Sequence, residues 1–121
     1  MATRALYIFK DSDTSITVYK HWDGYPSEDG AYSHIAKALP YAWDLPRFEA
    51  DDFASAFIAG NKPKGGGDVR CLNEASTNGD ALGAEYIYTI EANGDNQVKV
   101  TTVALWETEK AFDIVYLSLE D

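Results

Sequence analysis

Short runs in which apolar and polar residues alternate open and close the chain, and this period of two predicts β-strands. Two strands are expected at the start, over Arg4–Phe9 and Ser15–Lys20, joined by the polar segment 10–14, which has the length of a hairpin loop. The second half is again rich in strand patterns. The further strands are expected over Val69–Leu72, Glu85–Glu91, Val98–Leu105 and Phe112–Leu119.

Two segments between these runs show apolar residues at helical spacing. Ala31–Leu39 is expected to be a helix that Pro40 ends, and Ala50–Ala59 a second helix that Gly60 terminates. Because the helices are grouped rather than alternating with strands, the sequence predicts an α+β fold. We expect a mainly antiparallel sheet of five or six strands with both helices on one face, forming a single domain over residues 1–121.

Charge narrows the classes of partner. Twenty Asp and Glu against ten Lys and Arg give a formal charge of −10. This charge opposes direct nucleic-acid binding, which depends on cationic neutralisation of phosphates. It favours a basic protein partner, or imitation of nucleic acid, although a purely solubilising surface is the alternative.

The environment is predicted from the same composition. The chain has one cysteine, Cys71, and no apolar leader follows Met1, so we expect a cytoplasmic protein without disulfides. It contains no apolar run of about 18 residues, which argues against a membrane span.

The densest group of candidate site residues follows the second expected strand. This segment reads Tyr-Lys-His-Trp-Asp-Gly-Tyr-Pro, and the Asp-Gly and Tyr-Pro pairs predict a stiff turn that presents large side chains. The alternative is that the rings pack beneath the sheet edge as core. The candidate binding residues here are Tyr19, His21, Trp22, Asp23 and Tyr25.

Other candidates are more scattered. Lys62, Lys64 and Arg70 flank three glycines and can form a phosphate or ligand loop, although a plain linker explains the same composition. Tyr86 and Tyr88 alternate onto one strand face, where they can stack a ligand or serve as half-buried structure.

Catalytic and metal-binding patterns are scarce in the sequence. His21 and Asp23 form the one candidate acid–base pair, whereas His34 is expected on a helix surface. The chain lacks a Gly-x-Ser-x-Gly elbow, a Walker loop, a His-Glu-x-x-His helix and paired cysteines. We therefore expect no enzyme activity, no cofactor and no metal.

Several segments together resemble a family of small, uncharacterised bacteriophage and prophage proteins. They are Arg-Ala-Leu-Tyr at the first strand, Arg47-Phe48 before the second helix, Gly83–Tyr88, and above all the Tyr-x-His/Gln-x-Asp-Gly-Tyr-Pro element at Tyr19–Pro26. The likeness spans most of the chain. It implies a phage origin and, by analogy, a role in disabling host machinery, but no catalytic or ligand residues can be carried over from it. Arg47 is a further candidate binding residue of this chain.

Three functions remain open on the sequence. The first is an anti-defence inhibitor that associates directly with a host protein, one that is basic or handles nucleic acids. The second is a protein that sequesters a nucleotide-like ligand, and the third is a small enzyme using His21 and Asp23. Self-association as a homodimer is a further expectation, because β-rich segments leave sheet edges.

Overall fold

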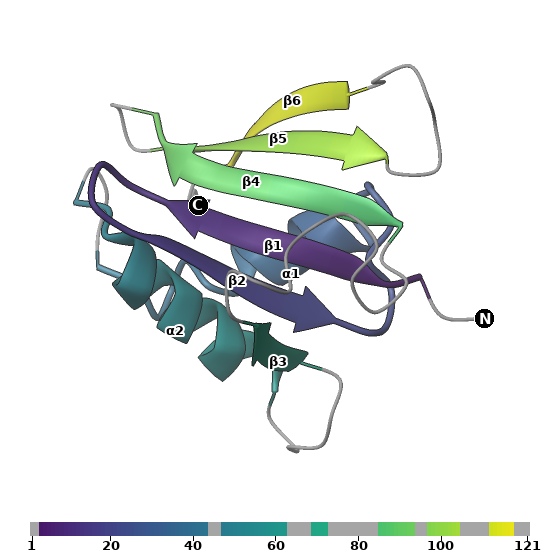
Figure 1. Ribbon diagram of the computed structural model, residues 1–121, viewed down its shortest axis with the longest axis horizontal. Helices are drawn as coiled ribbons and strands as arrows, with labels where there is room; N and C mark the ends of the chain where they lie inside the picture. The colour runs from purple at the N-terminus through teal and green to yellow at the C-terminus, as the bar shows by residue number, and fades with distance from the viewer. Residues whose placement is uncertain are drawn as a thin grey trace.

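The fold is built on one six-stranded sheet. The computed structural model describes residues 3–43, 47–62, 69–72, 85–93, 97–104 and 112–117. The strands are β1 (Ala5–Lys10), β2 (Ser15–Lys20), β3 (Val69–Leu72), β4 (Tyr86–Ala92), β5 (Val98–Ala104) and β6 (Phe112–Leu117). They lie in the order β3-β2-β1-β4-β5-β6 (Figure 1). All six predicted strands are therefore present, with ends close to those that the alternation predicts.

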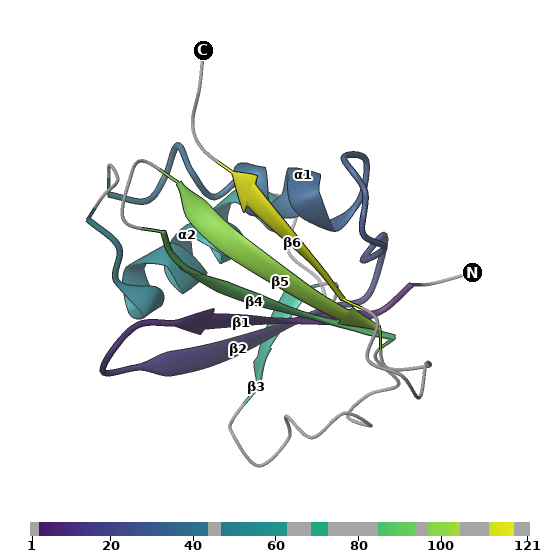
Figure 2. The ribbon, with the colours of Figure 1, turned by 90° about the horizontal axis from the view of Figure 1, so that it is seen from above.

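Both helices cover the same face of this sheet, which confirms the predicted α+β class (Figure 2). They are α1 (Ala31–Ala36) and α2 (Ala50–Asn61), and they connect the β1–β2 hairpin to β3. β1 and β4 run parallel, while every other neighbouring pair is antiparallel. β4 lies beside β1 in the sheet but follows the helices and β3 in the chain, so β1 and β4 are not joined by a hairpin and can run parallel.

The helix ends differ from the prediction, and local hydrogen bonds explain why. α1 stops at Ala36 rather than at Leu39, because the N–H groups of Ala38 and Leu39 bond to carbonyls only three residues back. This tighter turn precedes Pro40, which has no N–H to continue the helix.

The interpretation of Gly60 as a helix terminator was wrong. α2 continues through it to Asn61, whose side-chain amide donates to the carbonyls of Phe57 and His34, each at 2.9 Å. A Cβ at position 60 would lie 2.6 Å from the carbonyl oxygen of Lys37. Gly60 is thus a contact point between α2 and the turn after α1.

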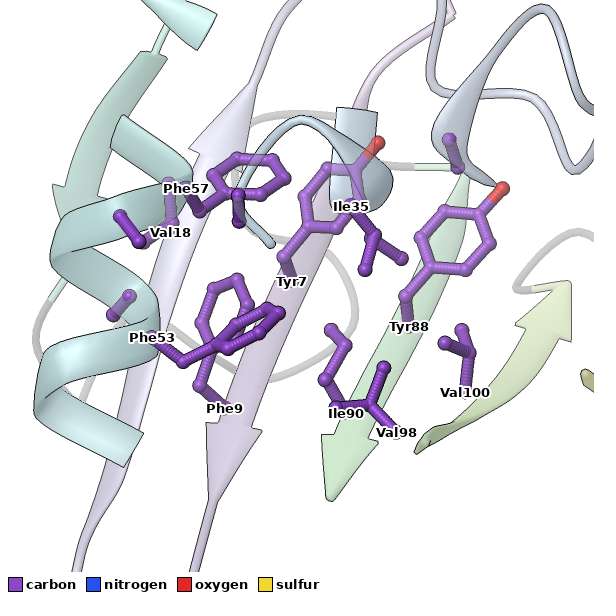
Figure 3. Packing of buried hydrophobic residues seen from close by; sticks show 14 of the residues in the cluster. Tyr7, Phe9, Val18, Ile35, Phe53, Phe57, Tyr88, Ile90, Val98 and Val100 are labelled. Carbon is purple, nitrogen blue, oxygen red and sulfur yellow. The ribbon is translucent and has the colours of Figure 1, made fainter. Parts of the chain in front are cut away.

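Aromatic rings fill the core between the sheet and α2 (Figure 3). The Tyr7 ring of β1 lies 4.6 Å from that of Phe57 and 5.1 Å from that of Tyr88, and the Phe9 ring packs against both helix phenylalanines, Phe53 and Phe57. All of these side chains are buried. Pairs of this geometry contribute beyond the area that they bury, so the helix is held mainly by aromatic packing.

The opposite face of the sheet has a smaller apolar group, in which Leu6 and Tyr19 are buried and Ile87 packs against them. Toward β6, the large side chains Ile114 and Tyr116 are exposed instead.

Within the described residues, neither helix is long and apolar enough to cross a bilayer.

Candidate functional site

The loop after β2, which holds the predicted site residues, is held by three hydrogen bonds to neighbouring parts of the fold. The buried hydroxyl of Tyr88 donates to the carbonyl of Gly24, and the Gly24 N–H donates to the carbonyl of Thr3 at 2.9 Å. The Tyr25 carbonyl accepts the N–H of Ala31 at 2.8 Å, which ties the loop to the start of α1. The loop is therefore held in place along its length, as the turn residues predict.

Two positions in this loop explain its sequence. A Cβ at Gly24 would lie 2.6 Å from the Cβ of Ala5, so only glycine fits beside β1. Asp23 has a φ of 58°, a left-handed conformation that Asp tolerates better than most residues do. The Asp-Gly pair thus satisfies both a tight approach and an unusual backbone angle.

The rings of the loop separate into buried and exposed groups. Tyr19 is buried, and its hydroxyl lies 2.8 Å from Nδ1 of His21. The His21 ring meets the Trp22 ring edge-on at 4.7 Å, and Trp22 is 48% exposed. Asp23 is exposed and Tyr25 is half-buried. Trp22 and Asp23 can therefore meet a partner, whereas Tyr19 belongs to the sheet.

The strand tyrosines share one face, as their alternation predicts, but they point into the protein. Tyr88 is fully buried, and its ring stacks against that of Tyr86 at 6.1 Å. Burial raises the pKa of Tyr88 above its usual value, and its neighbours Tyr7 and Tyr32 raise it further. Tyr88 is thus a core residue, which leaves only the half-buried Tyr86 near the surface.

The expected surface position of His34 was wrong. His34 is buried, with Nδ1 3.3 Å from the hydroxyl of Tyr7. Ala31 and Ile35 are also buried, so the buried side of α1 includes the position of His34. His34 follows Ala31 by three residues and precedes Ile35, so the three share the i, i+3, i+4 spacing of one helix side.

The candidate phosphate loop is only partly described. The Lys62 ammonium donates to the Val69 carbonyl at 2.9 Å, and the Arg70 guanidinium lies 4.8 Å from the Tyr19 ring centroid. Lys64 lies outside the described residues. The two described cations therefore have structural contacts around β3.

A second surface, which the site predictions did not include, joins the β1–β2 turn to the start of α2. We call its five carboxylates the acidic patch: Asp11, Asp13, Glu49, Asp51 and Asp52. They border two adjoining depressions of about 350 Å³ and 290 Å³, which share Glu49 and Asp51. Phe48 lines the first depression and Trp43 the second, so apolar rings lie among the charges.

Asp11 holds the two halves of this patch together. One of its carboxylate oxygens accepts the Ala50 N–H at 2.8 Å, and the other accepts the N–H groups of Asp13 and Thr14, also at 2.8 Å. These hydrogen bonds lower the pKa of Asp11 below its usual value, and the bond from Ala50 has the largest effect. Asp11 thereby caps α2 from outside the helix, near the positive end of its dipole.

Arg47, a predicted binding residue, covers one end of the patch. Its guanidinium carbon lies 3.3 Å from the centroid of the Trp43 ring, and Nη2 lies 3.5 Å from a carboxylate oxygen of Glu49. The backbone N–H of Trp43 donates to a carboxylate oxygen of Asp52 at 3.0 Å, which ties the main chain that carries this ring to α2. An aromatic face and a carboxylate thus already hold a guanidinium here.

Two further observations bear on identity and chemistry. Comparison of the chain with protein-family models, curated proteins and solved structures gave no match, so the resemblance to phage proteins stays a prediction. Across the described ranges, no three His, Cys, Asp or Glu residues are grouped so that they could hold a metal ion.

Proposed function

We propose that this chain is a binding protein whose acidic patch docks onto a basic surface of another protein and blocks that surface. The observation that carries the proposal is the convergence of five carboxylates from two separate elements around adjoining depressions. The formal charge of −10 adds a field that steers basic partners toward the protein. By the resemblance to phage proteins, the partner would be a cytoplasmic host protein of defence or nucleic-acid handling.

The internal contact of Arg47 supports a preference for arginine over lysine in the partner. A guanidinium can stack on an aromatic ring while it bonds to a carboxylate, which a compact ammonium does less well. Trp43 and Glu49 already hold Arg47 in this way, and Trp43 remains 42% exposed. An arginine of a partner would find the same chemistry beside it.

The patch can be tested with two variants of equal charge. In the patch variant, Asp13→Asn, Glu49→Gln and Asp51→Asn remove three charges, while Asp11 and Asp52 keep their structural bonds. The matched loop variant changes the exposed acids of the β2–α1 loop, Asp23→Asn, Glu28→Gln and Asp29→Asn. Both variants move the formal charge from −10 to −7, so only position distinguishes them.

Affinity capture from bacterial lysate, quantified by mass spectrometry at low and high salt, supplies the readout. A partner held by the patch should bind the wild type and the loop variant alike and elute with salt. The patch variant should lose on the order of tenfold in affinity, since each exposed charge pair contributes about 0.2–1 kcal/mol. Equal binding by the patch variant, or loss in the loop variant alone, would contradict the proposal.

A further inference from the structure

The two edges of the sheet differ in how they are protected. β3 is four residues long and carries Arg70, and such short, charged edge strands resist pairing with another sheet. β6 is six residues long, and its sequence Phe-Asp-Ile-Val-Tyr-Leu has one charged residue and no proline or lysine. In the described part of the chain β6 pairs only with β5, and no described strand lies along its outer edge.

Exposed side chains lie along the same strand. Ile114 is 45% exposed and Tyr116 is 49% exposed, although both are large and apolar. They are two residues apart on one strand, so they share a face of the sheet. Among the described residues, the outer edge of β6 and the side chains of Ile114 and Tyr116 are therefore available to a partner strand.

We infer that β6 pairs with β6 of a second copy of this chain, antiparallel about a two-fold axis, so that two sheets become one. Residues directly opposite each other in an antiparallel pair point to the same face of the sheet, so each residue can lie opposite only itself or a residue an even number of positions away. The two-fold axis therefore runs between one residue and the same residue of the second copy. An axis at Val115 places Ile114 opposite Tyr116 of the second copy, twice. The β-branched Ile114 then lies opposite the aromatic Tyr116 in both places, and such cross-strand pairs are favourable.

The neighbouring registers are poorer. An axis at Ile114 places that residue opposite itself and Tyr116 opposite Phe112, and an axis at Tyr116 places Tyr116 opposite itself, so neither register pairs Ile114 with Tyr116. An axis at Asp113 sets an aspartate opposite an aspartate, which is destabilising. The register at Val115 therefore makes the best use of the exposed residues.

Charge favours this edge over the acidic patch as the place where a second copy docks. Two chains of charge −10 repel each other, so association is least favourable where the two acidic patches would face each other. β6 lies three strands from β1, about 14 Å at ordinary strand spacing, and so more than a screening length of about 8 Å from the acidic patch at the β1 end. On the neighbouring strand, Lys99 lies opposite Tyr116, and Glu91 of β4 lies opposite Lys99 on its other side, so these two charges oppose each other.

Sedimentation equilibrium from about 1 µM to about 1 mM chain tests the pairing, with circular dichroism to confirm folding. We expect the wild type to reach twice the monomer mass, and Tyr116→Lys to weaken association at least tenfold. Tyr41→Lys is the matched control, because Tyr41 is 64% exposed outside β6 and the substitution changes the net charge identically. It should leave the dimer intact.

A charge pair then tests the register. The double variant I114K/Y116E keeps the net charge and places opposite charges across the proposed two-fold axis, so it should dimerise. The variant I114K/Y116K places like charges there and should be monomeric. A monomeric wild type, an open series of larger aggregates, or a dimer that survives Tyr116→Lys would overturn the inference; a monomeric I114K/Y116E would overturn the register.

Discussion

The hydroxyl of Tyr88 connects the buried core to the loop after β2, and Tyr88→Phe removes only this group. The ring stays, so its stacking with Tyr7 and Tyr86 is preserved. The buried carbonyl of Gly24 loses its donor. An unpaired buried carbonyl costs about 1–3 kcal/mol, which is the expected loss in the free energy of unfolding.

The change is large enough to measure in a chain of this size. An unfolding entropy of about 2.1 cal/mol/K per residue gives roughly 0.25 kcal/mol/K for 121 residues. The expected loss therefore lowers Tm by about 4–12 °C. Urea unfolding followed by tryptophan fluorescence gives the free energy, and Tyr32→Phe is the control. The Tyr32 hydroxyl lies 3.4 Å from Thr102 Oγ1, a long bond whose loss should cost about 0.5 kcal/mol, the lower end of the range for a hydrogen bond.

Alkaline pH provides a second readout of the same group. Burial raises the pKa of Tyr88 above 10, so the folded protein keeps the proton while the unfolded chain releases it near pH 10. The unfolded state then binds fewer protons, and stability falls by about 1.4 kcal/mol per pH unit above pH 10 from this group alone. Tyr88→Phe should reduce that slope by the same amount. The reasoning would be refuted by a Tyr88→Phe protein that is as stable as Tyr32→Phe at pH 8 and whose free energy of unfolding falls with pH above 10 as steeply as that of the wild type.

Three further predictions concern contacts that hold α2. Asp11→Ala should destabilise the protein at pH 7 and progressively less as the pH falls below 3.8, because the hydrogen-bonded carboxylate has a lowered pKa: its stabilising effect is complete above the unfolded value of 3.8 and is lost as the pH falls toward and through the folded value. Urea midpoints measured at several pH values from 7 downward check this trend. Gly60→Ala should destabilise, although alanine favours a helix interior by about 1 kcal/mol, because its Cβ would meet the Lys37 carbonyl; a raised Tm would contradict the contact. Phe57→Ala should cost about 3–5 kcal/mol, since the ring is fully buried, whereas Phe57→Leu should cost much less in the same urea titration.

Strands and helices could be predicted from this sequence because their signals are local. The alternation in Ser15–Lys20 and the spacing of Phe53 and Phe57 report directly which side chains face the core. The role of Gly60 could not be read in this way, since the same residue suits a helix end or a close contact. What decides is the Lys37 carbonyl beside it, and the sequence does not show that neighbour.

The candidate site, too, could be predicted only in part, because the sequence does not show which residues are neighbours in space. The Asp-Gly-Tyr-Pro turn predicts a fixed loop, and the loop is fixed, but the sequence could not separate the buried Tyr19 from the exposed Trp22. The acidic patch was missed because its halves lie about 40 residues apart, in a hairpin turn and at a helix start. Acidic residues at a turn and in a first helical turn are each ordinary; the Asp11–Ala50 hydrogen bond brings them together.

The two proposals, although independent, combine into a statement about affinity. A dimer through β6 would carry two acidic patches on one rigid sheet, so a partner with two basic sites could engage both patches. The second contact would then be intramolecular and raise the apparent affinity by about 10²–10⁴ without any new interaction. Tyr116→Lys should therefore weaken binding to a bivalent basic partner while leaving the affinity for an isolated arginine-rich peptide unchanged. If the peptide affinity fell as well, β6 would contribute to the binding surface itself, and the separation between pairing edge and acidic patch would be wrong.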